Sequence, residues 1–328
     1  MTSTSRDVAR AAGVSVATVS RAFSKNGSVS EVTRRRVLAH AERLGYSPNP
    51  TARRLTTGRS GTLGVIIPDI ANPFFADIVK GVQERARELR GSLLIVDTGE
   101  QQRRELDGAR ELARQVDGIV WASPRTAPDE LPDDLGVPVV LVNRRLPGWG
   151  SVLTDYEPGV RQALENLRAL GHLRVGYVAG PARSWAGQMR RQALLEHVAR
   201  LGLELDELGP VDPTIEGGLV AADLAVASQV TALVAFNDVV ACGVLRRLAA
   251  RRLRVPDDLS VVGCDNTWLA QLTAPALTTI EVPRHRAGRA AVGQLGDRLR
   301  DPDAEPEEVV LATSLVIRDS TAPPGLQA

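Results

Sequence analysis

The spacing of apolar residues divides this chain into two regions that meet near residue 60. In the longer C-terminal region, short continuous apolar runs alternate with stretches whose apolar residues recur every three or four positions. The continuous runs are LGVIIP, SLLIVDT, GIVWAS, VPVVLVN, RVGYVAG, ALVAFN and LSVVGCD, and the amphipathic stretches include residues 74–89, 160–170 and 239–251. Apolar strands separated by helices are typical of parallel sheets covered on both faces. We therefore expect an α/β fold for this region.

The N-terminal region has a helical pattern instead. The apolar residues of RDVARAA share one face of a first helix: Val8, Ala9 and Ala12. Ser5 can cap this helix and Gly13 can end it. After the turn, Ser15 can cap a second helix, VATVSRAF. A third helix is expected from about residue 31 to residue 44, after the loop SKNGSVS.

The second helix has an inward and an outward face. Val19, Ala22 and Phe23 have the spacing of a packed stripe. The third helix is expected to complete a small core with Val32, Val37, Ala41 and Leu44. The outward residues of the second helix are Val16, Ala17, Ser20 and Arg21. Two short helices across a tight turn, packed on a third, predict a helix-turn-helix whose second helix enters the DNA major groove. A three-helix bundle for protein contacts is the alternative.

Charge separates these two interpretations. Residues 1–60 contain 11 Lys and Arg against three Asp and Glu, a net charge of +8, although the whole chain carries +1. The remaining residues therefore carry −7. A basic head on an acidic body indicates contact with a polyanion. Together with the outward position of Arg21, this asymmetry favours DNA binding.

Residues 48–60 have the composition of a linker. The stretch SPNPTARRLTTGRSG contains two prolines, two glycines and several Ser and Thr residues. Its segment PTARRL offers about one and a half turns of helix, too few to be stable in isolation. A plain linker whose Leu55 packs on the following domain is one interpretation.

Polar and aromatic residues follow the apolar runs of the C-terminal region. These positions are Asp69, Asn72, Phe74, Phe75, Asn143, Arg144, Trp185, Arg190, Asn237, Asp238, Asp265, Asn266 and Trp268. Ligands of parallel sheets bind beyond the carboxyl ends of the strands. Carboxylate, amide and guanidinium groups beside aromatic rings suit a small polyhydroxylated ligand. Asp238 is expected to cap the following helix and Phe75 to lie in the core, whereas Trp268 fits either role.

The sequence lacks the usual signatures of enzymes. It contains no G-x-S-x-G, no phosphate loop and no His or Cys spacing of a metal site, so no catalytic residue, metal or cofactor is expected. The histidines are scattered, and His172 at a helix-to-strand corner is interpreted as a capping residue. Cys242 and Cys264 lie in apolar runs and are expected to be buried thiols.

Neither a membrane span nor a secretion signal is evident. There is no apolar run of the roughly eighteen residues that a membrane helix needs. The N-terminal stretch MTSTSRDVARAAG has no apolar core of a signal peptide, so a cytoplasmic location is expected.

Several motifs resemble those of the lactose/galactose-repressor family of bacterial transcription regulators. RDVARAAGVSVATVSRAF is followed in order by VSEVTRRRVLAHAERLGYSPNPTARRL. The resemblance implies that the DNA contacts come from Ser15, Val16, Ala17, Thr18, Ser20, Arg21, Ala52 and Leu55. It also implies that residues around PTARRL become helical on DNA, where Leu55 enters the minor groove as an apolar wedge. Ser24 departs from the family, which often has Asn there.

The C-terminal region is similar to the same family and, through it, to periplasmic sugar-binding proteins. IPDIANPFFADIVKGV, LGHLRVGYVAGP, FNDVVACG, LSVVGCDN and PALTTI occur in the family's order. The resemblance implies two lobes, with the chain crossing near 158, near 283 and once more towards its end. It further implies an effector site formed by Phe74, Asn143, Trp185, Arg190, Asn237 and Asp265. Ala193 and Val282 depart from the patterns of sugar-responsive members, so effector identity does not follow.

The predicted organisation is a helix-turn-helix domain at 1–47, a hinge at 48–60 and a two-lobed effector and dimerisation domain at 61–328. The predicted function is a repressor that binds palindromic operator DNA as a homodimer and responds to a small effector, a sugar or sugar derivative. The tail RDSTAPPGLQA has no heptad pattern, which favours a dimer over a coiled-coil tetramer. The alternatives are a solute-binding protein and a small-molecule enzyme on the same fold.

Overall fold

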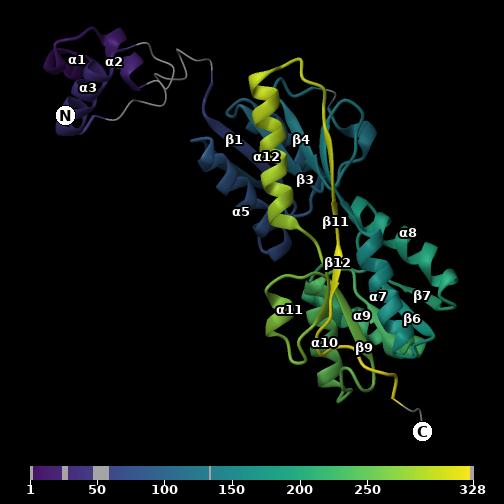
Figure 1. Ribbon diagram of the computed structural model, residues 1–328. Helices are drawn as coiled ribbons and strands as arrows, with labels where there is room; N and C mark the ends of the chain where they lie inside the picture. Colours follow the sequence, from purple (N-terminus) through teal and green to yellow (C-terminus); the bar gives the residue numbers. More distant parts are fainter. Residues whose placement is uncertain (1–2, 24–28, 47–58, 133, 326–328) are drawn as a thin grey trace. The chain divides into compact units, whose positions relative to one another are not determined.

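The computed structural model describes residues 3–23, 29–46, 59–132 and 134–325 (Figure 1). The chain divides into two compact units, Met1–Gly61 and Thr62–Ala328. The predictions for Ser24, Ala52 and Leu55 concern residues outside the described ranges. No helix in the described ranges combines the length and the apolar character that crossing a membrane requires.

The N-terminal unit contains three short helices: α1 (Ser5–Ala12), α2 (Val16–Phe23) and α3 (Glu31–Arg43). Gly13 ends α1 in a left-handed conformation with φ 64°. The start of α1 differs from the prediction, because the cap is Thr4 rather than Ser5. Thr4 and Asp7 form a reciprocal capping box, and this arrangement places Ser5 inside the first turn. Ser15 caps α2 as predicted, its Oγ accepting from Thr18 N at 3.1 Å.

The core of this unit is formed by small side chains from all three helices: Val8, Ala9, Ala12, Val19, Ala22, Val37 and Ala41. Phe23 and Tyr46 cover it edge to face, with ring centroids 5.9 Å apart. The prediction was wrong for Val32, which is 76% exposed, and for Leu44, which is 38% exposed. Val32 lies five residues before Val37 and so points about 140° away around the helix. Leu44 follows the last residue of α3, where the chain turns and brings Tyr46 to the core instead.

The C-terminal unit consists of two α/β lobes. The first lobe has a sheet of order β11-β5-β4-β3-β1-β2. Its strands are β1 (Thr62–Ile67), β2 (Ser92–Asp97), β3 (Gly118–Ala122), β4 (Val139–Val142), β5 (Gly150–Asp155) and β11 (Glu308–Ala312). All its strand pairs are parallel. Helices α5 (Pro73–Glu88), α6 (Gln102–Ala113) and α12 (Arg284–Arg300) pack against it, and a 3-10 turn spans Pro128–Glu130.

The second lobe repeats this plan with the order β12-β10-β9-β8-β6-β7. Its strands are β6 (Arg174–Val178), β7 (Glu204–Leu208), β8 (Ala232–Val234), β9 (Ser260–Asp265), β10 (Thr278–Glu281) and β12 (Ser314–Val316). Its helices are α7 (Glu157–Ala169), α8 (Trp185–Arg200), α9 (Ile215–Ser228), α10 (Asp238–Ala250) and α11 (Leu269–Leu272). The β10–β12 pair is antiparallel and the others are parallel. These two sheets confirm the predicted fold class.

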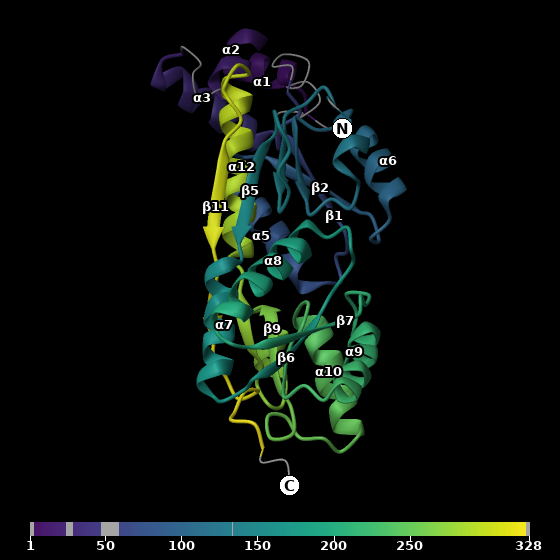
Figure 2. The same ribbon diagram turned by 90° about the vertical axis from the view of Figure 1, so that its right-hand side faces the viewer.

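The chain passes between the lobes three times, as predicted. The passages are β5 to α7, β10 to α12 and β11 to β12 (Figures 1 and 2). Thr313 joins the first and third passages, because its hydroxyl donates to Asp155 O at 2.8 Å and accepts from Gly159 N at 3.1 Å. A change in the angle between the lobes would therefore have to occur at these three passages.

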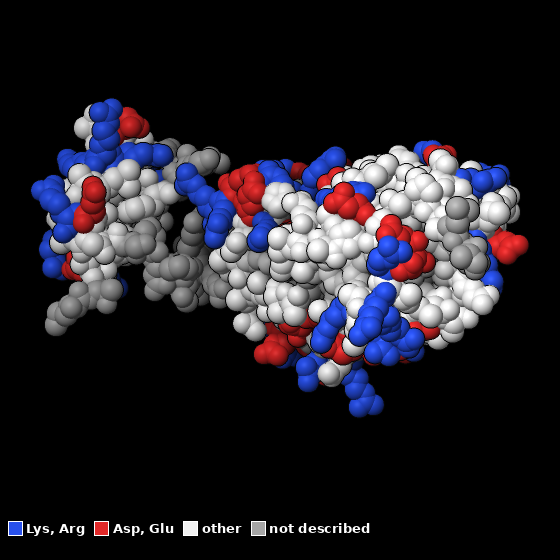
Figure 3. Space-filling model, turned by 90° about the horizontal axis from the view of Figure 1, so that it is seen from below, with Lys and Arg blue, Asp and Glu red and all other residues white. Residues whose placement is uncertain are grey.

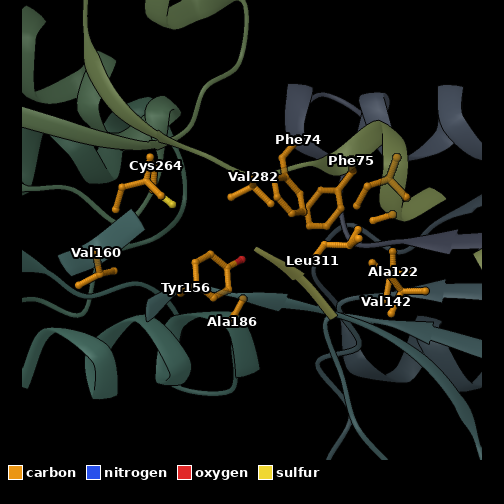
Figure 4. Packing of buried hydrophobic residues seen from close by; sticks show 14 of the residues in the cluster. Phe74, Phe75, Ala122, Val142, Tyr156, Val160, Ala186, Cys264, Val282 and Leu311 are labelled. Atoms are coloured by element: carbon orange, nitrogen blue, oxygen red, sulfur yellow. The ribbon is translucent and has the colours of Figure 1, made fainter. Parts of the chain in front are cut away.

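One apolar cluster runs through both lobes. Phe74 and Phe75 at the start of α5 belong to the same cluster as Tyr156 and Val282, which lie at two of the passages (Figure 4). Phe75 is 3% exposed, in line with its predicted core position. The continuous packing means that the cleft between the lobes is lined by core residues as well as polar ones.

Candidate functional site

The predicted DNA-contacting residues of α2 lie on the surface of the N-terminal unit. Ser15, Val16, Ala17, Ser20 and Arg21 are exposed, and Thr18 is half-buried. Val16 is 44% exposed, so its apolar side chain can contact another surface. Figure 3 shows Lys and Arg side chains distributed around this unit. The arrangement offers a basic surface with the N-terminal end of one short helix uncovered.

A cleft in the C-terminal unit lies at the carboxyl ends of the strands of both lobes. From the first lobe it is lined by Asn72, Phe74, Phe75, Glu100, Ser123, Arg125 and Asn143. From the passage and the second lobe come Tyr156, Ser184, Ala186, Arg190, Pro213, Phe236, Asn237 and Asp265. The space that the centre of a water molecule can occupy there is about 30 Å³. This is room for about two water molecules, so a larger ligand requires the walls to separate.

Five of the six residues predicted to bind an effector line this cleft together: Phe74, Asn143, Arg190, Asn237 and Asp265. Trp185 does not line it. It is the first residue of α8 and half-buried, and its neighbours Ser184 and Ala186 face the cleft instead. Trp268, which fitted either role, is 57% exposed and lies outside the cleft lining.

Arg190 is held between two aromatic rings. Its guanidinium carbon is 4.9 Å from the Tyr156 ring centroid and 4.5 Å from that of Phe236. The residue is 4% exposed, and its Nη1 lies 3.6 Å from Cys264 Sγ. Within the described residues, Arg190 Nε has no hydrogen-bond partner. A buried donor without a partner is costly, so this group is available to a ligand acceptor in the cleft.

Asp265 supplies an acid in the same wall. It is 3% exposed, and burial, together with the nearby charge of Asp238, raises its pKa to about 8. Its carboxyl is therefore largely protonated near neutral pH and can donate as well as accept. Its backbone is strained, with φ 121°, and Ser123 and Asn143 at the ends of β3 and β4 have φ 48° and 54°. Such strain is concentrated at ligand sites, where the surrounding structure holds it.

Asp238 does not have the capping role predicted for it. The cap of α10 is Asn237, whose Oδ1 accepts from Val240 N at 2.9 Å. Asp238 is already the first helical residue and is completely buried. It accepts from Thr267 N and from the hydroxyls of Thr267 and Thr279. Burial raises its pKa to about 6. Asp238 therefore fastens α10 to the segment that follows Asp265.

The amide side chains of the cleft are partly used by the protein. Asn237 Oδ1 caps α10, and Asn143 Oδ1 accepts from Thr154 Oγ1 at 2.8 Å. Each amide is thereby oriented, and its NH₂ group remains for a ligand acceptor. Asn237 of the second lobe and Asn143 of the first lobe thus both present hydrogen-bond donors.

Sequence reasoning missed several cleft residues, among them Glu100, Ser123, Arg125, Tyr156 and Phe236. All follow the end of a strand: β2, β3, β5 or β8. The rule that identified Asn143 and Asp265 applies equally to these positions. The segment GSVLTD of β5 is not among the continuous apolar runs, so no strand end was predicted before Tyr156.

His172 and the two cysteines lie outside the cleft lining. The His172 ring is 2.9 Å from Thr231 Oγ1 and 3.0 Å from Ala322 O, so it joins the corner before β6 to the C-terminal segment. Burial lowers the pKa of His172. Cys264 is buried and Cys242 is partly buried, and burial raises both thiol pKa values. No cluster of His, Cys, Asp and Glu suited to a metal ion occurs within the described ranges.

Comparison with known proteins identifies the two units. Residues 4–49 match the family described as bacterial regulatory proteins, lacI family, and residues 164–321 match the periplasmic binding protein-like domain. The chain is 32% identical to the transcriptional regulator DegA of Bacillus subtilis over 98% of its length and 99% of that protein. It is 33% identical to the repressor CytR of Escherichia coli over 97% of its length and 96% of that protein.

The chain belongs to the LacI family. It is a DNA-binding transcriptional regulator with a helix-turn-helix head and an effector-binding body, as the sequence predicted. These relatives are regulators and not enzymes, which agrees with the absence of catalytic motifs.

Solved structures of relatives have the same architecture. The lac repressor dimer bound to operator and the anti-inducer ONPF matches 98% of this chain and 100% of its own, with a TM-score of 0.83 and 28% identity. The regulator CelR in complex with cellobiose matches 97% and 99%, with a TM-score of 0.72 and 32% identity. A ribose-bound LacI family regulator from Enterococcus faecium matches 80% and 99%, with a TM-score of 0.72 and 27% identity.

Proposed function

We propose that this LacI family member is a repressor whose affinity for operator DNA is controlled by a small, polyhydroxylated effector bound in the cleft between the lobes. The observation that carries the proposal is the convergence of Arg190, Asn237 and Asp265 from the second lobe with Phe74 and Asn143 from the first. Donors, an acid and aromatic faces suit hydroxyl groups and the C–H face of a sugar ring. Relatives with bound cellobiose and ribose support this class.

The narrow cleft supports a coupling between effector and DNA. Side chains of both lobes line this cleft, so one effector can contact both lobes at once. A ligand that contacts both lobes favours one angle over the other. By linkage, DNA then changes effector affinity by the same factor by which effector changes DNA affinity. We propose that the effector releases DNA.

The head is proposed to bind DNA through α2 in the major groove, with Ser15, Val16, Ala17, Thr18, Ser20 and Arg21 facing the base pairs or the flanking phosphates. Ala52 and Leu55 are proposed to enter the minor groove from the hinge. The lac repressor structure contains a dimer on its operator, so a homodimer and a palindromic operator are proposed here.

Exposed apolar residues support a dimer. Trp268 is 57% exposed and Leu272, on α11, is 73% exposed. Leu94 and Ile95 on the edge strand β2 are 39% and 48% exposed. We propose that a second copy covers these surfaces. Leu272→Glu should then shift the sedimentation profile from dimer towards monomer, whereas an unchanged profile would place the interface elsewhere.

A thermal-shift screen tests the effector class. A ligand that binds only the folded state raises the unfolding temperature by mass action. Wild-type protein should be stabilised by at least one neutral sugar or nucleoside, and Asp265→Ala by none of them. If the protein were instead a solute-binding protein, the ligand would bind in the same way without any change in DNA affinity. If the protein were an enzyme, the stabilising compound would be chemically converted.

A further inference from the structure

A buried ion pair forms part of the cleft wall in the first lobe. Arg125 Nε donates to Glu100 Oε2 at 2.6 Å, and Arg125 Nη2 donates to Glu100 Oε1 at 3.1 Å. The Arg125 side chain is 9% exposed and that of Glu100 is 28% exposed. Both residues line the cleft. A forked pair of this kind fixes the plane of the carboxylate as well as its position.

The loop that carries Arg125 is anchored from two sides. Glu105 on α6 is 1% exposed and accepts from Arg125 N, Thr126 N and the Thr126 hydroxyl, at 2.6–3.0 Å. Arg144, after β4, donates through Nη2 to Thr126 O at 2.7 Å. The loop backbone that carries the Arg125 side chain is therefore held in place by two charged side chains, Glu105 and Arg144.

Stability does not account for this arrangement. Taking a guanidinium and a carboxylate out of water costs free energy that their attraction only partly returns, and apolar replacements are often as stable. A carboxylate that is already oriented, by contrast, binds a ligand with little further loss of side-chain freedom. A pre-positioned charged pair at a ligand cleft is thus better explained by recognition.

The hydrogen-bonding positions that the pair leaves unused indicate the kind of ligand. Arg125 Nη1 donates to Ser123 O at 3.1 Å, so three of the five N–H donors of this guanidinium have acceptors. Glu100 takes one hydrogen bond on each oxygen and keeps further lone pairs. Hydroxyl groups can donate to those lone pairs, whereas a phosphate or carboxylate placed against Glu100 would meet the like charge of its carboxylate.

We propose that Glu100, oriented by Arg125, is the specificity-determining acceptor of the first lobe and recognises hydroxyl groups of an uncharged polyol. This inference rests on the proposed function, since it assumes that the effector occupies the cleft. It adds a residue that selects among polyols, because a sugar lacking the recognised hydroxyl leaves the Glu100 carboxylate without its donor.

The test pairs one variant with ligands that differ by one hydroxyl. Wild-type protein and Glu100→Gln are titrated calorimetrically with ribose, glucose, cellobiose and cytidine, with deoxyribose, deoxyglucose and deoxycytidine, and with ribose phosphate. For the sugar that binds wild type, loss of the recognised hydroxyl should weaken binding about tenfold or more, as expected for a hydrogen bond to a charged group. Glu100→Gln should bind the parent sugar more weakly than wild type by a similar factor. The affinities of this variant for the parent and deoxy sugars should differ by much less.

Glu308→Gln is the matched control. Arg145 holds Glu308 with the same Nε and Nη2 fork, at 2.6 Å for both bonds, but the pair is on the surface and outside the cleft lining. It should leave all affinities within about twofold of wild type. If Glu100→Gln does not fold, Glu100→Asp retains the charge while withdrawing it from the cleft, and the same selective loss is expected.

Two results would overturn the inference separately from the proposed function. Equal weakening of parent and deoxy sugars by Glu100→Gln, or no weakening, would remove Glu100 from recognition while leaving a sugar effector intact. Preferred binding of ribose phosphate would reverse the charge assignment of the first lobe. If none of the compounds bound wild type, both the polyol class of the proposed function and this inference would fail.

Discussion

Arg284 and Asp77 form an ion pair beside the passage from β10 to α12, with Arg284 Nη2 3.0 Å from Asp77 Oδ2. The same Nη2 donates to Asn266 O at 3.1 Å. Asp77 is on α5 of the first lobe, whereas Asn266 directly follows Asp265 in the second. Arg284 therefore connects the segment that carries a cleft acid to a helix of the opposite lobe, and its side chain is only 10% exposed.

Replacing Arg284 should weaken the coupling between effector and DNA. In Arg284→Met, movement of the Asp265 segment no longer pulls on α5, so the factor by which effector changes operator affinity should fall about fivefold or more. Fluorescence anisotropy of labelled operator, with and without saturating effector, gives this factor. Arg289→Met is the control, since Arg289 pairs with Glu84 and Glu88 inside the first lobe. Equal coupling in wild type and Arg284→Met would contradict the prediction.

Arg21→Ala should relax sequence preference at one position in each operator half-site. An arginine that donates two bonds to a guanine contributes about 1–3 kcal/mol of discrimination. Binding to a randomised operator library, followed by sequencing, measures the preference position by position. Arg10→Ala removes another exposed charge, from α1, and should weaken binding to all sequences alike. The same uniform loss in Arg21→Ala would identify Arg21 as a phosphate contact.

Leu55→Ala should reduce DNA bending and specific affinity while effector affinity stays unchanged. An apolar wedge unstacks a base step only when the hinge lies in the minor groove. Gel mobility of circularly permuted operator fragments reports the bend, and titration of effector in the absence of DNA is the internal control. Undiminished bending by the variant would return residues 48–60 to a plain linker.

Asp265 should make folding stability depend on pH. Its pKa is raised to about 8 in the folded protein, above its usual value of 3.8, so the folded state holds the proton more tightly than the unfolded state. Stability should therefore fall as pH rises between these two values, by at most about 1.4 kcal/mol per pH unit from this group. Asp238, with a pKa raised to about 6, acts in the same direction.

Asp265→Asn removes the Asp265 contribution. Urea unfolding should show the variant gaining stability relative to wild type between about pH 5 and about pH 8. Asp223→Asn is the control, because the Arg247 and Arg251 side chains lower the pKa of Asp223, and its stabilising effect is lost at acid pH instead. A constant difference between Asp265→Asn and wild type across this range would refute the prediction. In the same variant, effector binding should weaken about tenfold or more.

The sequence by itself determined those helix ends and strands that depend on residues close to one another along the chain. Gly13 ends α1 and Ser15 caps α2 whatever surrounds them, because both act through backbone groups a few residues away. The seven continuous apolar runs all form strands, and burial on both sheet faces explains this for all of them except SLLIVDT, which forms the exposed edge strand β2. Parallel strands place their carboxyl ends at one edge of each sheet, which marked the residues that follow them as candidates, and the family resemblance then predicted that Asn143, Arg190 and Asp265 meet.

Tertiary structure alone decided the features that depend on distant neighbours. The strand β7, ELDEL, has mostly polar residues because it lies at a sheet edge, and β12 is a strand only because β10 pairs with it. The cap residue Asn237 and the first helical residue Asp238 are neighbours in the sequence. Which of them caps the helix therefore depends on the residue at which α10 begins. The link between Glu100 and Arg125 joins the ends of β2 and β3, and Arg284 joins two lobes. No spacing along the chain encodes such contacts, because they exist only after the sheets have assembled.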